Sequence, residues 1–205
     1  MPDRSGYDRE ANDWYVEEAW AVHLLVEYMQ WAKVTVHVHD PCCGMGTIPM
    51  ACRAHGIKAT GSDLIDRGFG EAHGERADFM AEKFDPSIMS GANIIASNPP
   101  FILADDFIRF ALAQEKISTI CVLLPAGWGH AAGTDKARTR HKWLRSLPLA
   151  LELKIGPRPS MPPGKLILKG IRPGGGKGDF SWWIFRRGHK GLPQSDWLTR
   201  RDDVT

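Results

Sequence analysis

The stretch that decides the fold reads His37-Val38-His39-Asp40-Pro41-Cys42-Cys43-Gly44-Met45-Gly46-Thr47. A strand-like run ends at an acidic residue, a turn with two glycines follows, and a helical pattern continues to His55. The two glycines allow a tight turn and let backbone N–H groups approach a ligand closely at the start of the helix. This order predicts a strand, a ligand-binding loop and a helix in succession.

Two common phosphate-binding motifs do not match this loop. Position 49 is proline where a dinucleotide fingerprint needs its third glycine, and no Gly-Lys-Ser/Thr is present. An acid at Asp40 that faces the glycines would repel a pyrophosphate and attract an ammonium group. Asp63 ends the next predicted strand at a distance suited to a ribose diol, and Asp78 is followed by the apolar Phe79. These acids indicate a nucleoside ligand that carries a positive charge.

Strand and helix patterns alternate along the chain, which is typical of βαβ units and a largely parallel sheet. The predicted strands are 35–40, 58–63, 93–97, 117–125, 149–155 and 180–186. The predicted helices are 14–31, 48–55 and 105–115.

The 205 residues are most economically one domain, 1–205. We expect flexible ends at 1–13 and 190–205. Two connections, 127–145 and 156–179, show no regular pattern, and both are basic. Unstructured connections longer than about 15 residues are usually functional or disordered. The basic character of both connections favours a binding role.

The net charge of +2 conceals an uneven distribution. Residues 1–110 carry 9 Lys and Arg against 17 Asp and Glu, whereas residues 111–205 carry 17 against 7. A basic second half suits a polyanion, because Lys and Arg contacts to phosphates bind nucleic acid regardless of its sequence. The alternative is that both sets are solvated faces that mix once the chain folds. The candidate nucleic-acid contacts are Lys136, Arg138, Arg140, Lys142, Arg158 and Lys165.

The most informative motif follows the predicted strand 93–97 and reads Asn98-Pro99-Pro100-Phe101. Each proline fixes its own φ near about −65° and forces the residue before it into an extended conformation. The motif therefore predicts a rigid polar hook beside an aromatic ring, suited to a flat amine or amide. The alternative is a simple turn that stops the strand.

These motifs together resemble the class I S-adenosylmethionine-dependent methyltransferases, in particular the adenine-specific amino-methyltransferases of DNA. The resemblance implies a Rossmann-like three-layer α/β/α sandwich with a mostly parallel seven-stranded sheet whose last strand is antiparallel. It implies S-adenosyl-L-methionine as cofactor, and the Trp14-Tyr15 segment as a further stretch in contact with it. The implied cofactor-binding residues are Asp40, Cys42, Gly44, Gly46, Thr47, Asp63, Asp78 and Phe79. The implied catalytic residues are Asn98, Pro99, Pro100 and Phe101.

The substrate stays open at this point. Methylation of the exocyclic amine of adenine in DNA is the favoured interpretation. The same hook would hold a glutamine amide in a protein or a base in RNA. The chain could also be a nucleic-acid-binding relative without turnover.

Cysteine usage and hydropathy restrict the setting. Four cysteines, two of them adjacent, do not form a disulfide pattern, which indicates a reducing, cytoplasmic environment. No apolar stretch approaches the roughly 20 residues of a membrane-spanning helix, so we expect no membrane partner. A zinc site from His37, His39 and the cysteines is disfavoured, because adjacent cysteines cannot easily supply two tetrahedral vertices. We expect no metal.

Overall fold

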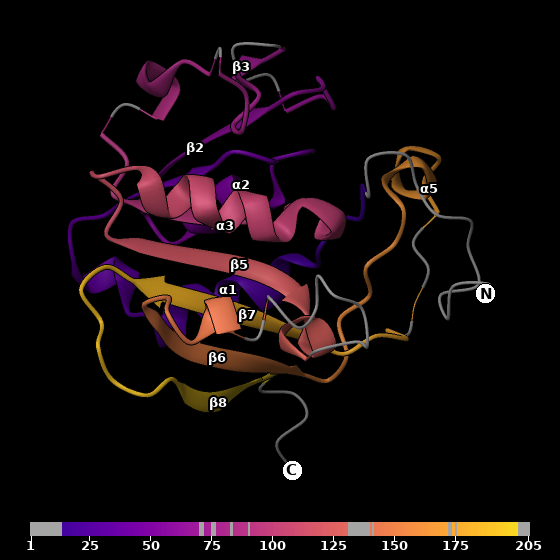
Figure 1. Ribbon diagram of the computed structural model, residues 1–205. Coiled ribbons are helices and arrows are strands. Elements are labelled where there is room, and N and C mark those ends of the chain that lie inside the picture. Colours follow the sequence, from indigo (N-terminus) through magenta and orange to yellow (C-terminus); the bar gives the residue numbers. More distant parts are fainter. Residues whose placement is uncertain are drawn as a thin grey trace.

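The computed structural model describes residues 14–69, 72–74, 77–82, 84–89, 91–130, 140, 142–171, 174 and 176–200. Eight strands form one sheet in the order β3-β2-β1-β4-β5-β7-β6-β8 (Figure 1). The strands are β1 His37–Asp40, β2 Lys58–Asp63, β3 Ala72–His73, β4 Ile94–Ser97, β5 Thr119–Pro125, β6 Leu149–Gly156, β7 Phe180–Arg186 and β8 Gln194–Thr199. The helices are α1 Ala19–Tyr28, α2 Thr47–Ala54, α3 Ala104–Ala113 and α5 Gly164–Leu168. Short 3-10 turns are η2 Trp31–Lys33, η4 Pro86–Met89, η5 Phe101–Leu103 and η6 Ala126–Gly129.

The sheet is parallel except around β7. β1 pairs in parallel with β2 and β4, and β4 pairs in parallel with β5. β7 is antiparallel to both of its neighbours, β5 and β6. The carboxyl ends of β1, β2 and β4 therefore meet at one edge of the sheet, where ligands bind in open α/β folds.

Helices cover both faces of the sheet, which confirms the expected three layers (Figure 1). In β5, Cys121 and Leu123 pack in one buried cluster with α1 and α2. Ile120, Val122 and Leu124 pack in a second cluster with α3. Because successive side chains of a strand point to opposite faces, a strand buried on both sides reads as an unbroken apolar run. That is why β5 was recognisable from its sequence.

The strand count and the carboxyl-terminal tail differ from expectation. The sheet has eight strands rather than seven, and residues 194–199 of the expected flexible tail form β8, which pairs in parallel with β6. Only Leu198 of this edge strand is buried. A strand that buries one side chain has no apolar alternation, so the sequence carries almost no signal for it.

Three other segments also differ from the prediction. Residues 14–18 are not helical, and α1 begins at Ala19. Connection 156–179 contains the five-residue helix α5, and connection 127–145 begins with η6. The expected flexible residues 1–13 lie outside the described residues. Within the described part of the chain, no helix is long and apolar enough to cross a membrane.

Candidate active site

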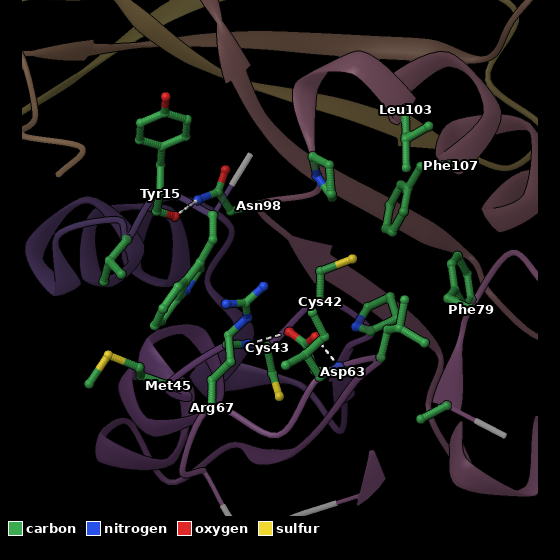
Figure 2. A pocket seen from close by; sticks show the side chains of 18 of the residues that line it. Tyr15, Cys42, Cys43, Met45, Asp63, Arg67, Phe79, Asn98, Leu103 and Phe107 are labelled. Carbon is green, nitrogen blue, oxygen red and sulfur yellow. Dashed lines mark hydrogen bonds between the residues drawn. The ribbon is translucent and has the colours of Figure 1, made fainter. Parts of the chain in front are cut away.

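A cavity of about 220 Å³ opens at the edge of the sheet where β1, β2 and β4 end (Figure 2). Its walls come from the glycine loop, the segments after β2 and β4, the start of α3, and the extended chain before α1. The lining residues include Trp14, Tyr15, Glu17, Cys42, Gly44, Thr47, Asp63, Arg67, Asp78, Phe79, Asn98, Pro100, Ile102 and Phe107. Most of the predicted cofactor-binding set is thus brought to one place.

The glycine loop and Asp63 form one hydrogen-bonded unit. Gly44 has a φ of +53°, and its N–H donates to Oδ2 of Asp63 at 2.9 Å. Oδ1 of Asp63 accepts from the N–H of Ile65 at 2.9 Å. These bonds fix the carboxylate at the cavity wall while it still has lone pairs for a ligand.

Gly46 has a different role from Gly44. It has a φ of +84°, stands at the start of α2, and does not line the cavity. A Cβ at this position would collide with the ring of Phe69. Glycine is therefore required here by backbone conformation and by packing.

Asp40 lies behind the cavity wall. It is 1% exposed, and its Oδ1 accepts from the Ser97 hydroxyl at 2.7 Å and from the N–H of Cys42 at 3.0 Å. Burial, reinforced by the nearby carboxyl of Glu17, raises the pKa of Asp40 well above its usual value. Asp40 thus joins the ends of β1 and β4, and its predicted contact with the cofactor stays a prediction.

The remaining predicted cofactor residues line the cavity. Cys42 and Thr47 lie on the side of the glycine loop, and Asp78 accepts from the N–H of Met80 at 3.2 Å. Phe79 is 3% exposed and packs against Phe84, Phe107 and Phe110. This wall of the cavity is flat and apolar with one acid beside it.

The Asn98 side chain is held by the chain before α1. Nδ2 donates to the carbonyl oxygen of Tyr15 and to Oε2 of Glu17, both at 2.9 Å. Oδ1 is buried and has no hydrogen-bond partner among the described residues. A buried acceptor without a partner is unfavourable unless something else supplies the donor.

The other residues of the motif surround this amide. Pro99 is buried, and Pro100 lines the cavity. The ring of Phe101 lies parallel to Tyr15, at 6.1 Å between centroids and an angle of 2°, and it also contacts Phe180. Phe101 itself does not line the cavity.

Glu17 is a site residue that the sequence did not single out. It is 9% exposed, and burial raises the pKa of its carboxyl. The hydrogen bonds from Asn98 and Thr47 oppose that rise. The resemblance implied a cofactor contact for the neighbouring Trp14-Tyr15 segment, but nothing in the local pattern distinguishes Glu17 from Glu18.

The extended segment Trp14–Val16 is held in place by connection 156–179. The N–H of Val16 donates to the Pro162 carbonyl at 2.9 Å, and the N–H of Gly164 donates to the Trp14 carbonyl at 3.0 Å. The Trp14 ring lies where a Cβ of Gly164 would be. The guanidinium of Arg67 lies 4.0 Å from the centroid of the same ring. One basic connection therefore supports, from outside the cavity, the segment that forms part of its wall.

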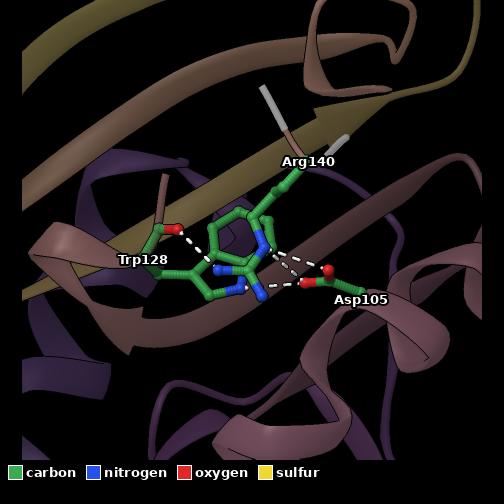
Figure 3. Close-up of polar contacts among 3 residues, drawn as sticks. All are labelled: Asp105, Trp128 and Arg140. Carbon is green, nitrogen blue, oxygen red and sulfur yellow. Dashed lines mark hydrogen bonds and ion pairs between the residues drawn. The ribbon is translucent and has the colours of Figure 1, made fainter. Parts of the chain in front are cut away.

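The six residues predicted to contact nucleic acid lie in different environments. Arg140 pairs with Asp105 at 2.9 Å and donates to the Trp128 carbonyl at 3.1 Å, while Trp128 Nε1 also donates to Asp105 (Figure 3). Arg158 pairs with Asp179 at 2.7 Å on the surface. Lys142 and Lys165 are exposed. Lys136 and Arg138 lie outside the described residues.

No family model and no curated protein matches this chain in sequence. Solved structures do match its fold. The methyltransferase subunit of a type I restriction-modification system from Streptococcus thermophilus superposes with a TM-score of 0.58 at 13% identity, over 87% of this chain and 46% of that one. The type IIG restriction endonuclease BpuSI gives 0.57 at 13% identity, over 91% and 27%.

The protein has the class I methyltransferase fold. A structure described as a proposed RNA methyltransferase from Pyrococcus horikoshii also matches, with a TM-score of 0.52 at 14% identity, over 82% of this chain and 83% of that one. The chain spans about half the length of the two type I modification subunits that it matches. Since identities are low, these likenesses concern the fold alone.

Proposed function

We propose that this protein transfers a methyl group from S-adenosyl-L-methionine to the exocyclic amine of adenine in DNA. The observation that carries the proposal is the Oδ1 atom of Asn98, which is buried and has no hydrogen-bond partner in the described part of the chain, in a side chain that lines the cavity. Such an atom is suited to accept an N–H from a flat amine, and the carbonyl of the neighbouring Pro99 would be the second acceptor.

The cavity suits the cofactor's chemical groups. Asp63 would hold the ribose hydroxyls, and Asp78 with the apolar Phe79 would receive the adenine. Gly44, which has no side chain, would let the backbone approach the methionine part. When bound, S-adenosylmethionine supplies an electrophilic methyl group on a sulfonium ion.

The chain's own residues would act by positioning. The lone pair of an exocyclic amine is delocalised into the ring, which makes the nitrogen a weak nucleophile. If Asn98 Oδ1 and the Pro99 carbonyl each accept one N–H, the nitrogen becomes more tetrahedral and its lone pair turns towards the methyl donor. This is orientation and electrostatics, without a covalent enzyme intermediate. The predicted stacking of Phe101 on the base, a contact of about 1–3 kcal/mol, would require its ring to move away from Tyr15, because Phe101 does not line the cavity.

DNA is the proposed substrate because the second half of the chain is basic and because Lys142 is exposed to solvent, where it could contact phosphates. Adenine in a duplex would have to be flipped out of the stack to reach Asn98.

The deciding experiment incubates the protein with cofactor labelled in the methyl group, together with unmethylated DNA, RNA and protein. The pools are separated and digested to nucleosides or amino acids. Label in N6-methyladenine of DNA is the expected result. Label in protein alone would overturn the adenine assignment in favour of an amide, and label in RNA alone would overturn the choice of DNA.

Asn98→Ala is the matched test of the hook. The variant loses the proposed acceptor but no residue assigned to the cofactor, so we expect transfer to fall by about 100-fold or more while cofactor affinity changes less than threefold. Isothermal titration with S-adenosylhomocysteine and the labelling assay measure the two quantities separately. Unchanged turnover in Asn98→Ala would refute the role of this residue.

A further inference from the structure

The amide of Asn98 could face its surroundings in two ways, because a half turn of its last bond exchanges Oδ1 and Nδ2. The C=O and NH2 groups of the amide have nearly the same shape, so their hydrogen-bond partners determine which of the two atoms, Oδ1 or Nδ2, faces the target amine. On the proposed function, only the orientation with Oδ1 unpartnered can accept the target amine. The residues that select this orientation therefore matter to the reaction through Asn98.

Two acceptors meet the donor side of this amide. Nδ2 carries two hydrogens, and the Tyr15 carbonyl and Glu17 Oε2 accept one each, both at 2.9 Å. The flipped amide would lose both bonds and place Oδ1 against two oxygen atoms. The observed orientation satisfies both Nδ2 hydrogens and leaves Oδ1 without a partner among the residues that the structure describes.

Glu17 can perform this task because it is itself held. The N–H of the preceding residue, Val16, donates to the Pro162 carbonyl. The carboxyl of Glu17 is buried and also receives a hydrogen bond from Thr47. Glu18, the next residue, points elsewhere, since its Oε2 accepts from the N–H of Ser160 at 2.7 Å.

We propose that Glu17 is a positioning residue that, together with the Tyr15 carbonyl, fixes the Asn98 amide with Oδ1 free to accept a hydrogen bond from the target amine. The proposal rests on the proposed function for its purpose. Its structural part concerns the free protein and is testable without cofactor or substrate.

The first test measures hydrogen exchange of the two Asn98 Nδ2 protons by NMR, with the signal assigned by its absence in Asn98→Ala. We expect both protons to be protected in the wild type. In Glu17→Leu, which lacks the acceptor at similar volume, one proton should exchange at least tenfold faster. Glu18→Gln is the matched control and should leave both rates unchanged. Equal protection in wild type and Glu17→Leu would overturn the proposal.

The second test uses transfer of labelled methyl to unmethylated DNA. Glu17→Gln keeps the size and one acceptor but can also donate to Oδ1, so both amide orientations become accessible. We expect kcat to fall by about tenfold to a hundredfold, the range associated with one charge-assisted hydrogen bond, with KM for DNA and affinity for S-adenosylhomocysteine within threefold. A large loss of cofactor affinity with unchanged Asn98 exchange would make Glu17 a cofactor ligand and overturn the positioning role.

The two proposals fail in different ways. A wild-type protein without transfer to DNA, but with both Nδ2 protons protected and one released in Glu17→Leu, would refute the DNA substrate and leave the orienting role intact. If Glu17→Leu does not fold, as judged by circular dichroism, Glu17→Gln serves the exchange measurement. Unchanged exchange and unchanged kcat in that variant would overturn the positioning role.

Discussion

At the scale of single residues, acids with similar sequence contexts end in different environments. Asp40 and Asp63 both end a strand at the edge of the sheet. Asp40 is buried and bonded to Ser97, whereas Asp63 lines the cavity and is oriented by the N–H groups of Gly44 and Ile65. A carboxylate oriented towards a cavity is available to ligand hydroxyls, and a buried one is not.

We therefore expect Asp63→Ala to weaken cofactor binding. Loss of hydrogen bonds to a charged group is worth about 1.5–3 kcal/mol, which is roughly a tenfold or larger rise in Kd. Isothermal titration with S-adenosylhomocysteine measures it. Asp66→Ala, at an exposed position whose carboxylate accepts from the nearby N–H of Gly68, is the control and should bind normally. Equal affinities for the two variants would contradict the assignment of Asp63.

At the scale of elements, the chain before α1 is the largest departure from the sequence pattern. Apolar residues at helical spacing predicted a helix from residue 14. Residues 14–16 are extended because Val16 and Trp14 pair with Pro162 and Gly164. Pairing with a segment almost 150 residues away in the chain outweighs local helix propensity, which is a weak preference. The result is a wall of the site that is formed by the segment before α1 and held in place by residues near α5.

This wall should depend on the absence of a side chain at Gly164. A Cβ there would collide with the Trp14 ring, so Gly164→Val should displace the segment that carries Tyr15 and Glu17. We expect transfer to drop at least tenfold while the fold judged by circular dichroism is retained, because Gly164 lies in α5, outside the eight-stranded sheet. Gly174→Ala, with no atom close to its Cβ and in the same connection, is the control. Similar activities in the Gly164→Val and Gly174→Ala variants would show that methyl transfer does not depend on the position of the segment before α1.

The burial of one residue in the edge strand β8 leads to a separate prediction about stability. Leu198 is 3% exposed and belongs to the cluster under α1 and α2, whereas Leu192 is 89% exposed. Leu198→Ala should lower the free energy of unfolding by about 2–3 kcal/mol through lost burial and a cavity. Leu192→Ala should change it by less than about 0.5 kcal/mol. Urea unfolding of the two variants decides whether the last strand belongs to the cooperative fold.

At the scale of the whole molecule, polar groups buried inside the sheet link stability to pH. His39 on β1 is fully buried, and its ring nitrogens bond to Thr60 and Ser62 on β2. Burial, followed by the neighbouring His37, lowers the pKa of His39 to about 3. In the unfolded chain the pKa is about 6.5. The unfolded state therefore binds the proton between these values, and the stability that His39 contributes is present above pH 6.5 and lost as the pH falls towards 3.

Glu17 and Asp40 act in the opposite direction. Burial raises their pKa values, so the folded state holds their protons more tightly and their contribution is lost as the pH rises. A comparison of the wild type with a His39 variant separates the contribution of His39 to the pH dependence of stability from those of Glu17 and Asp40. His39→Gln should flatten the decline in stability between pH 6 and 4 by up to about 1.4 kcal/mol per pH unit. Chemical unfolding across this range measures it, and His130→Gln, at an exposed position, should leave the slope as in the wild type. An unaltered slope in His39→Gln would contradict the assignment.

Many of the helices and strands could be predicted from the local sequence pattern. β2 and β7 were predicted with their observed bounds, and α2 and α3 within one or two residues. Their signals are burial on both faces of a strand, helical spacing, and glycines at the turn. The hook was also readable, because two prolines restrict the backbone whatever surrounds them.

The sequence by itself therefore determined the alternating strands and helices, the glycine loop and the rigid Asn98 turn, since each depends on neighbours in the chain. Only the tertiary structure decided that Asp40 is buried, that residues 14–16 are extended, that residues 194–199 form a strand, and that Glu17 holds Asn98. The physical reason is distance along the chain. The Glu17–Asn98 bond joins residues 81 positions apart, and the Glu18–Ser160 bond joins residues 142 apart. Contacts of this length leave no periodic trace in either segment and exist only once the sheet has brought both segments together.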